Sequence, residues 1–380
     1  MAEWLPFLAQ TVGAKPPLRV PAWLGRLAAG AGVSMMTQIR GSSNAKAKRQ
    51  LGWEPAWPSW RQGSAAGQER NREGAVTTAD VYQQLRPLMF AIAYRMIGSV
   101  SEAEDIVQEA FLRYHSASSG AGIESPKAFL SAVTTRLCID YLRSARARRE
   151  AYIGEWLPEP LLTGDPAGPP GPAELAEQAD WLSMAFLLLL ERLSPVERAV
   201  FLLHDVFGYG YDEVAAIVGK SADNCRQLAL RARRHVAESK PRFETSRVKR
   251  EELASRFFAA VGGGDIDGLV SLLAEDAVVY GDSGGARPSW PRPIAGRDHV
   301  GRLLAGLIEQ IRQVGIVIRP AEINGQPGAM FLDPAGRLVN VFVLDIADRR
   351  IQTIRSVINP DKLRHLGPLA NLDDLRRQLG

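Results

Sequence analysis

The residues best equipped to contact a ligand form a run of cations that follows the turn Gly219-Lys220. Its cations are Arg226, Arg231, Arg233 and Arg234, with Lys220 and Lys240 on either side, and the polar Ser221 and Gln227 lie among them. On a helix, its first side chains can donate hydrogen bonds to base edges in the major groove of DNA, while later arginines contact phosphates. A solvated basic face is the plain alternative, but the turn that precedes the run favours DNA binding.

A second basic cluster lies earlier in the chain, beside aromatic side chains. Its cations are Arg136, Arg143, Arg146, Arg148 and Arg149, and its aromatics are Phe129 and Tyr141. Unpaired bases stack on aromatic rings while cations hold the phosphates, so this combination suits an opened DNA strand. The rings can equally belong to a protein core, which we expect of Phe129.

Residues 101–114 carry the opposite charge. Their acids are Glu102, Glu104, Asp105 and Glu109, which Arg113 opposes. An acidic face does not suit DNA, so it indicates either a contact with a basic protein partner or a solvated helix.

Catalytic and metal chemistry have little support. The candidate acid/base pair is Asp282 with His299, and we expect both in a loop region. The remaining histidines, His115, His204, His235 and His365, lack metal-site spacing. We therefore expect no enzyme, no cofactor and no metal. A C-terminal pocket for a small-molecule ligand stays open as an alternative, as does a C-terminal enzyme.

Apolar spacing and capping residues predict helices over residues 79–150. Ser101 is the expected N-cap of the second helix, with Glu104 completing a capping box, and Pro126 opens the third. The residues expected to line one face of that third helix are Phe129, Val133, Leu137 and Tyr141.

A linker and a second helical domain follow. Residues 154–172 are rich in proline and glycine, which predicts a linker. Trp156 and Leu157 are unusually apolar for a linker, so we expect them to dock on a folded neighbour. Residues 173–240 return to helical spacing, and their short helix, Gly219 turn and longer helix are typical of a helix-turn-helix.

After Lys240 the pattern changes to an α+β domain. Helices are expected at residues 253–261, 269–273 and 300–314, and strands at 317–318, 330–332, 338–346 and 351–358. Partial alternation over 337–346 indicates a strand buried on both faces. The predicted fold class is multidomain: two all-α domains, then this α+β domain.

Composition excludes several protein classes. The chain has 380 residues, of which 46% are hydrophobic and 23% charged, with a net charge of +4. These values are those of an ordinary globular protein. The longest purely apolar run, residues 185–190, is far shorter than the roughly 20 residues that cross a bilayer, so we expect no membrane partner. With only Cys138 and Cys225, we expect a reducing, cytoplasmic setting.

Residues 79–240 resemble an extracytoplasmic-function (ECF) bacterial sigma factor. The string from Ala103 to Phe111 is similar to region 2.2, which binds the β′ clamp helices of core RNA polymerase. The resemblance implies polymerase contacts through Glu104, Asp105, Ile106, Val107, Gln108 and Glu109.

The two basic stretches complete this resemblance. Residues 126–143 resemble regions 2.3 and 2.4, which melt and read the −10 promoter element. Residues 211–236 resemble region 4.2, which reads the −35 element, and the resemblance places region 4 at the β flap of polymerase. The implied DNA-binding residues are Lys127, Arg136, Arg143, Ser221, Arg226, Gln227, Arg231, Arg233 and Arg234. A helix-turn-helix repressor is an alternative, but it leaves the acidic helix unexplained.

Residues 249–380 resemble the SnoaL-like extension of one ECF subfamily, which implies a cone-shaped regulatory domain. Three motifs carry the resemblance: Trp156–Pro160, Asp282–Ala286 in place of DGGGK, and Asn359–Leu363. Ser283 and Ala286 replace a glycine and the lysine of DGGGK, which leaves Arg287 as a nearby cation. The implied regulatory residues are Trp156, Leu157, Pro158, Asp282, Gly284, Gly285, Asn359, Pro360, Asp361 and Lys362.

The N-terminal part of the chain contains four short motifs: Val20–Leu24, Ser43–Arg49, Leu51–Pro55 and Ser59–Arg61. Through them, residues 1–63 resemble the C-terminal tail of an NAD-dependent epimerase or dehydratase. The dinucleotide loop GxGxxG is absent, so no cofactor site is expected. We expect a partly disordered appendage, either a remnant of gene fusion or an over-extended gene model for which Val76 is an alternative start. The expected domains are 1–75 (appendage), 76–150 (sigma region 2), 151–172 (linker), 173–242 (sigma region 4) and 249–380 (SnoaL-like).

Overall fold

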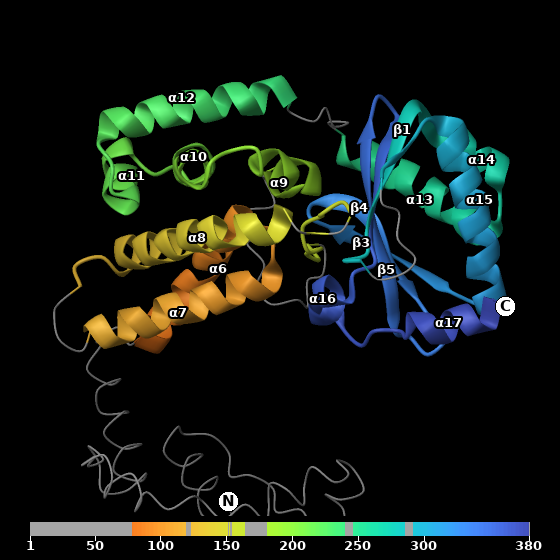
Figure 1. Ribbon diagram of the computed structural model, residues 1–380, viewed down its shortest axis with the longest axis horizontal. Coiled ribbons are helices and arrows are strands. Elements are labelled where there is room, and N and C mark those ends of the chain that lie inside the picture. Colours follow the sequence, from red (N-terminus) through yellow and green to blue (C-terminus); the bar gives the residue numbers. More distant parts are fainter. Residues whose placement is uncertain are drawn as a thin grey trace, which may run out of the picture. The chain divides into compact units, whose positions relative to one another are not determined.

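The structure, a computed structural model, describes residues 78–118, 123–150, 152, 154–163, 181–239, 246–285 and 292–379 (Figure 1). Residues Tyr82–Gly380 form one compact unit. The predicted appendage, the proline-rich part of the linker and Arg287 lie outside the described residues, as do the side chains of Arg146, Arg148 and Arg149.

The first helical group contains α6 (Thr78–Ile97), α7 (Val100–Ser118) and α8 (Pro126–Glu150). The capping box predicted at the start of α7 is wrong. The hydroxyl of Ser99 accepts a hydrogen bond from the Glu102 amide at 3.2 Å, and Glu104 binds Arg86 at 2.6 Å. Because Ser99 already occupies the capping position, Ser101 lies inside the helix.

The buried face of α8 is displaced from the predicted one. The predicted side chains at 129, 133, 137 and 141 are half-buried, whereas Leu130, Thr134 and Cys138 are fully buried. Thr134 is accommodated because its hydroxyl donates to the sulfur of Met89 at 3.4 Å, and a buried polar group with a partner costs little. An apolar pattern does not reveal such a position.

The second helical group contains α9 (Met184–Leu190), α10 (Pro195–Phe201), a π-helical turn (Leu202–Val206), α11 (Tyr211–Val218) and α12 (Ala222–Ser239). The predicted helix-turn-helix is confirmed in α11 and α12. Gly219 ends α11 with a φ of 67°, a conformation that favours glycine. The hydroxyl of Ser221 accepts from the Asn224 amide at 3.2 Å, as expected of an N-cap.

The C-terminal domain is α+β, as predicted, with a six-stranded sheet in the order β2-β1-β6-β5-β4-β3. Its strands are β1 (Leu273–Asp282), β2 (Ile294–Ala295), β3 (Val317–Ile323), β4 (Gln326–Leu332), β5 (Leu338–Ala347) and β6 (Arg350–Val357). Strands β1 and β6 pair in parallel, while the other pairs are antiparallel. Strand β5 is largely buried on both faces, as its partial alternation predicts. Strand β3 is longer than predicted because, at the sheet edge, much of its surface is exposed and its apolar signal is weak.

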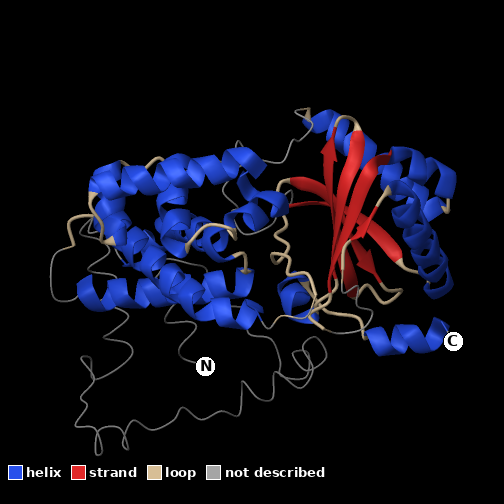
Figure 2. Ribbon diagram, turned by 45° about the horizontal axis from the view of Figure 1, so that its top comes forward, coloured by secondary structure: helices blue, strands red, loops and turns tan. Residues whose placement is uncertain are grey.

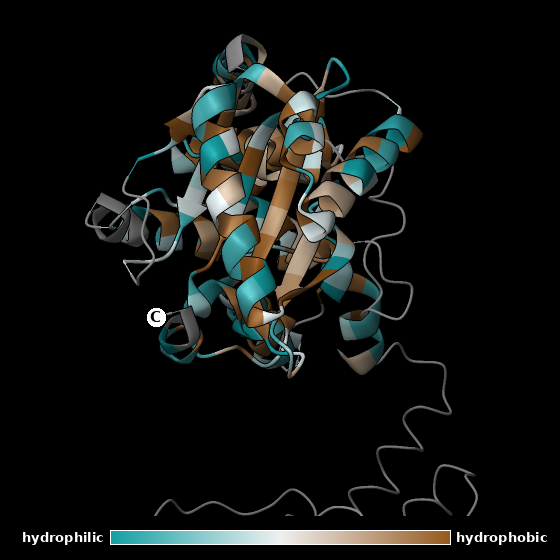
Figure 3. Ribbon diagram, turned by 90° about the vertical axis from the view of Figure 1, so that its right-hand side faces the viewer, coloured by the Kyte–Doolittle hydropathy of each residue, from teal (hydrophilic) through white to brown (hydrophobic). Residues whose placement is uncertain are grey.

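Helices α13 (Arg247–Gly263), α14 (Ile266–Leu272) and α15 (Arg297–Val314) cover one face of this sheet (Figure 2). The strands behind them are largely apolar (Figure 3). The other face packs Val341, Val343 and Val357 against Leu157 of the linker and Met184 of α9. The short helices α16 (Pro360–Leu363) and α17 (Leu372–Leu379) and a 3-10 turn (Arg364–Leu366) complete the domain. A membrane-spanning helix is not found in the part of the chain that the structure describes.

Candidate functional site

Helix α7 exposes part of the predicted polymerase-binding surface. Asp105 and Gln108 are exposed, whereas Ile106 and Val107 are buried in the helical group. Glu109 pairs with Arg113 at 2.8 Å, and Glu104 with Arg86. The buried Ile106 and Val107 therefore orient the helix, so that Asp105 and Gln108 face outward.

The surface of α7 also contains an apolar residue that sequence reasoning missed. Leu112 is 63% exposed. It follows Gln108 by one helical turn and so shares that face. The sequence signal of this helix was its acidic residues, and a single apolar residue among them gives no comparable signal.

Helix α8 makes direct contact with the helix-turn-helix through residues predicted to bind DNA. Arg136 donates to the carbonyls of Ile217 and Ala216, each at 2.9 Å, at the carboxyl end of α11. Lys127 lies 5.1 Å from the ring centre of Tyr209, whose hydroxyl is 2.7 Å from that of Ser131. Arg143 remains exposed and pairs with Asp140 at 3.4 Å. In this arrangement Arg136 satisfies helix carbonyls instead of phosphates.

Helix α12 presents its predicted cations to solvent. Arg226 pairs with Asp223 at 2.5 Å, and Arg233 with Asp205 at 2.7 Å. Arg231 lies 3.6 Å from Glu197, while Gln227 and Arg234 are exposed. Because exposed ion pairs contribute little to stability, these arginines can exchange carboxylates for phosphates.

The linker motif at 156–160 forms hydrogen bonds with the amino end of α7. The Glu159 carboxylate accepts hydrogen bonds from the Ser99 hydroxyl and the Val100 amide, each at 2.7 Å, and from the Ser101 amide at 3.1 Å. A carboxylate at this end satisfies amides that have no partner within the helix and complements the helix dipole. The amino end of α7 is thus capped by two groups, the local Ser99 hydroxyl and the Glu159 carboxylate from a segment distant in sequence.

The same motif buries Leu157 and Pro158 and half-buries Trp156. Leu157 is 1% exposed. Gly98, with a φ of 71°, lies so close to Trp156 that an added Cβ would sit 2.8 Å from the indole ring. Glycine is therefore required at the turn between α6 and α7 for both conformation and space.

Asp282, at the end of β1, holds the linker from the other side. Its Oδ2 accepts from the Leu157 amide at 2.8 Å and from the Lys362 ammonium at 2.6 Å. Lys362 also donates to the Leu157 carbonyl at 2.5 Å, and the Tyr152 hydroxyl donates to Asp282 Oδ1 at 2.5 Å. Burial and the bond to Asp282 raise the pKa of Tyr152. We call Tyr152, Leu157, Asp282 and Lys362 the linker clamp.

The remaining predicted regulatory residues surround the linker clamp. The Asn359 side-chain amide donates to the Tyr152 hydroxyl at 2.9 Å, and a Cβ on Gly284 would overlap that amide. The Gly284 amide donates to Asp282 Oδ1 at 3.1 Å. The Asp282–Ala286 motif lacks the lysine of DGGGK, and Lys362 places an ammonium group beside it instead. Pro158 is buried, and Gly285, Pro360 and the exposed Asp361 flank these contacts.

Three residues that sequence reasoning missed extend the grip on the linker. The Tyr94 hydroxyl donates to the Glu159 carbonyl at 2.7 Å and accepts from the Asn324 side-chain amide at 2.6 Å. Asn324 also accepts from the Leu161 amide at 3.0 Å. His365, one of the histidines without metal-site spacing, lies 2.8 Å from the Pro160 carbonyl. Each of these contacts joins residues distant in sequence, so no local motif predicts them.

The candidate acid/base pair is not assembled. Asp282 is buried within the linker clamp, whereas His299 is exposed on α15 and lies 3.1 Å from the Ala295 carbonyl. Within the described residues, no hydrogen bond or ion pair joins the two side chains, and no group of His, Cys, Asp and Glu could hold a metal ion.

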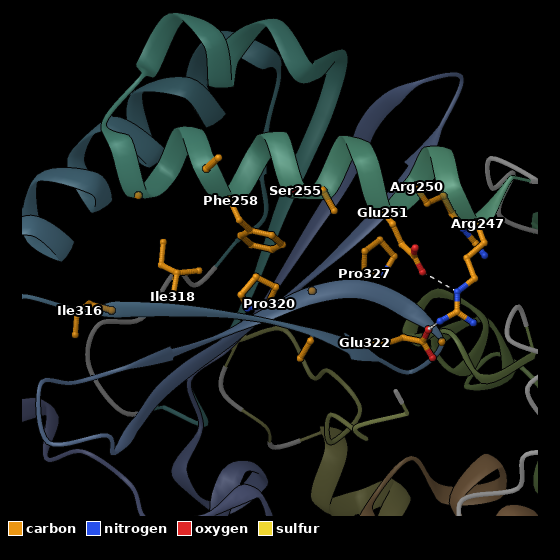
Figure 4. A pocket seen from close by; sticks show the side chains of 16 residues that line it. Arg247, Arg250, Glu251, Ser255, Phe258, Ile316, Ile318, Pro320, Glu322 and Pro327 are labelled. Carbon is orange, nitrogen blue, oxygen red and sulfur yellow. Dashed lines mark hydrogen bonds and ion pairs between the residues drawn. The ribbon is translucent and has the colours of Figure 1, made fainter. Parts of the chain in front are cut away.

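A groove of about 740 Å³ runs between α13 and β3 (Figure 4). Phe258, Ile318 and Pro320 line its apolar middle. At one end Arg247 pairs with Glu251 at 2.7 Å and with Glu322 at 2.6 Å.

Three family models match successive parts of this architecture. They are Sigma-70 region 2 at residues 81–148, Sigma-70 region 4 at 183–236, and the SnoaL-like domain at 254–354. The fold is thus that of a sigma factor that carries a SnoaL-like domain.

The relatives agree with these matches. The ECF RNA polymerase sigma factor SigJ of Mycobacterium tuberculosis is 38% identical over 291 residues, covering 74% of this chain and 91% of that protein. The probable ECF RNA polymerase sigma factor SigI of the same organism is 33% identical over 299 residues, covering 78% and 94%. The SigJ crystal structure matches with a TM-score of 0.61 and 36% identity, covering 76% of this chain and 99% of that one. The chain belongs to the ECF RNA polymerase sigma factors.

Membership confirms the function that the motifs predict. Sigma factors bind core RNA polymerase and promoter DNA and act in transcription initiation. The repressor alternative is excluded. The resemblance of residues 1–63 to an epimerase tail stays a prediction.

Proposed function

We propose that three helical surfaces divide the work of promoter recognition. The α7 surface around Asp105, Gln108 and Leu112 meets the β′ clamp helices of polymerase, and region 4 meets the β flap. Lys127, Arg136 and Arg143 of α8 contact the opened −10 strand. This division is supported by charge, because α7 exposes acids while α8 and α12 expose cations.

On α12, the start of the helix lies nearest the bases. Arg226 and Gln227 contact −35 base edges from the turn after Ser221, and Arg231, Arg233 and Arg234 contact phosphates. Exposure of these side chains on a capped helix supports the assignment.

We further propose that the SnoaL-like domain modulates initiation by holding the linker. One observation carries this proposal: residues 156–160 are bound from two sides. Glu159 caps α7, while Asp282 and Lys362 bind Leu157. The linker joins the −10 and −35 modules, so a domain that fixes it also limits how these modules can be placed on DNA.

The SnoaL-like domain acts here without chemistry of its own. Asp282 is buried and binds the linker, whereas His299 is exposed on α15 and lies near the Ala295 carbonyl. This arrangement supports a regulatory domain over an enzyme. A small-molecule effector is compatible with the groove beside α13.

The test is run-off transcription with core polymerase. A chain that ends at Ile358 lacks Asn359 and Lys362, so its linker clamp cannot form. We expect changed transcript yield with unchanged binding to core polymerase, measured by co-sedimentation. A chain that ends at Lys240 serves as the comparison without the whole domain, and unchanged yield from both truncations would remove the regulatory role.

A further inference from the structure

We propose that Leu230 of α12 recognises a thymine of the −35 element through the methyl group of that base. This inference rests on the proposed contact of α12 with −35 bases, and it deepens that contact by naming a base that one further side chain selects. Leu230 is 50% exposed. Its apolar surface lowers the free energy of the system only when a partner covers it and removes it from water.

Helix geometry places Leu230 on the side of α12 that we propose to face DNA. Residues three and four positions apart share a helix face, so Leu230 lies beside Arg226, Gln227 and Arg234, all of which are exposed. The other side of the helix packs into the protein through its buried residues, which are Cys225, Leu228, Ala229, Ala232 and Val236. Leu230 is therefore an apolar side chain in the middle of the outward, polar face.

Charge identifies the molecule that covers this side chain. The arginines within four residues of Leu230 along α12 are Arg226, Arg231, Arg233 and Arg234. An apolar protein surface that covered Leu230 would also have to remove these cations from water, which is costly. DNA phosphates are instead attracted by them, so a DNA duplex can cover Leu230 while its charges compensate those of the arginines.

The chemistry of the major groove then selects the base. A leucine side chain neither donates nor accepts hydrogen bonds, so it cannot recognise the donors and acceptors on base edges. The C5-methyl group of thymine is the apolar group that the major groove presents. Burial of one such group contributes a factor of roughly four in affinity.

The experiment uses the holoenzyme that the full chain forms with core polymerase. A −35 sequence is first selected from duplexes randomised in this region. Each of its thymines is then replaced by deoxyuridine, which removes the methyl group and keeps the hydrogen-bonding groups of the base, and Kd is measured by fluorescence anisotropy. We expect replacement of one thymine to weaken binding roughly three- to fivefold.

Leu230→Ala should weaken binding to the unmodified duplex by a similar factor, and deoxyuridine at that position should then cause no further loss. This variant remains folded, because Leu230 is exposed and alanine is a strong helix former. Val248→Ala, which changes an apolar side chain that is 73% exposed on α13, is the matched control and should retain the full effect of deoxyuridine.

Arg226→Gln distinguishes failure of this inference from failure of the proposed function. If Arg226→Gln and Leu230→Ala both bind the duplex as tightly as the unchanged chain, α12 does not contact the −35 element and the proposed function fails. If Arg226→Gln weakens binding but no thymine responds to deoxyuridine, or the response persists in Leu230→Ala, only recognition by Leu230 is overturned. A loss of affinity of Leu230→Ala for core polymerase without DNA also overturns it, since Leu230 then contacts polymerase.

Discussion

At the scale of single residues, Lys362 determines how firmly the linker is held. Its ammonium group joins Asp282 to the Leu157 carbonyl and lies 4.4 Å from the ring centre of Trp156. Both members of the ion pair are buried, with side chains 9% and 0% exposed. A buried carboxylate that loses its cation is costly, because neither water nor another charge replaces it.

Lys362→Met is therefore expected to lower the free energy of unfolding by roughly 3 kcal/mol, measured by urea unfolding followed through tryptophan fluorescence. Arg364→Met is the matched control, because its pair with Asp361 is largely exposed. That control should cost under about 0.5 kcal/mol. Adding Asp282→Asn to Lys362→Met should restore part of the lost stability. If Lys362→Met and Arg364→Met lower the free energy of unfolding equally, the linker clamp is not a buried ion pair.

At the scale of elements, the cations of α8 and α12 differ in the groups that they contact. Arg136 of α8 caps α11, so reading an opened −10 strand with this side chain requires α8 and α11 to separate. The paired arginines of α12 are themselves exposed, and they bind the side chains of Asp223, Glu197 and Asp205, so no helices have to separate to make them accessible. The cations of α12 that we propose to contact DNA are thus accessible, whereas Arg136 of α8 is occupied by α11.

Arg234→Gln should weaken binding to a −35 duplex and reduce its salt dependence. Each phosphate contact contributes roughly 0.9 to the slope of log affinity against log salt concentration, so loss of one contact lowers the slope by about that amount. Fluorescence anisotropy across a salt series measures it. Arg302→Gln, exposed on α15, is the control, and an identical slope for both variants would exclude a phosphate contact by Arg234.

At the scale of the whole molecule, three segments distant in sequence meet at the linker clamp. The Gly284 turn, the Asn359 motif and the linker must fit together before Asp282 can bind Leu157. On the proposed regulatory role, we expect this assembly to link the folding of the C-terminal domain to promoter recognition, because a change in one segment removes contacts made by the others.

Gly284→Ala tests this link. Both Gly284 (φ 63°) and Gly336 (φ 77°) have left-handed backbones, but a Cβ on Gly284 overlaps Asn359, whereas one on Gly336 meets nothing within 4 Å. Both variants carry the backbone strain, so their difference isolates the collision. We expect Gly284→Ala to change run-off yield without changing affinity for core polymerase. The idea fails if Gly336→Ala changes the yield as much.

The sequence by itself determined the order of domains, the helix-turn-helix, the α+β class and the largely buried β5. These follow from local spacing: apolar periodicity, the Gly219 turn and the Ser221 cap act within a few residues. The motifs likewise led to most residues around the linker clamp, including Asp282, Asn359 and Lys362.

Only the tertiary structure decided which groups these residues meet. It showed that Glu159 caps α7, that Lys362 stands beside the motif lacking a lysine, and that Arg136 faces α11. It also displaced the predicted buried face of α8, because Thr134 finds a partner in the core. A hydrogen bond between residues far apart in the chain leaves no periodic trace in either segment, since each side chain is compatible with many partners until the fold selects one.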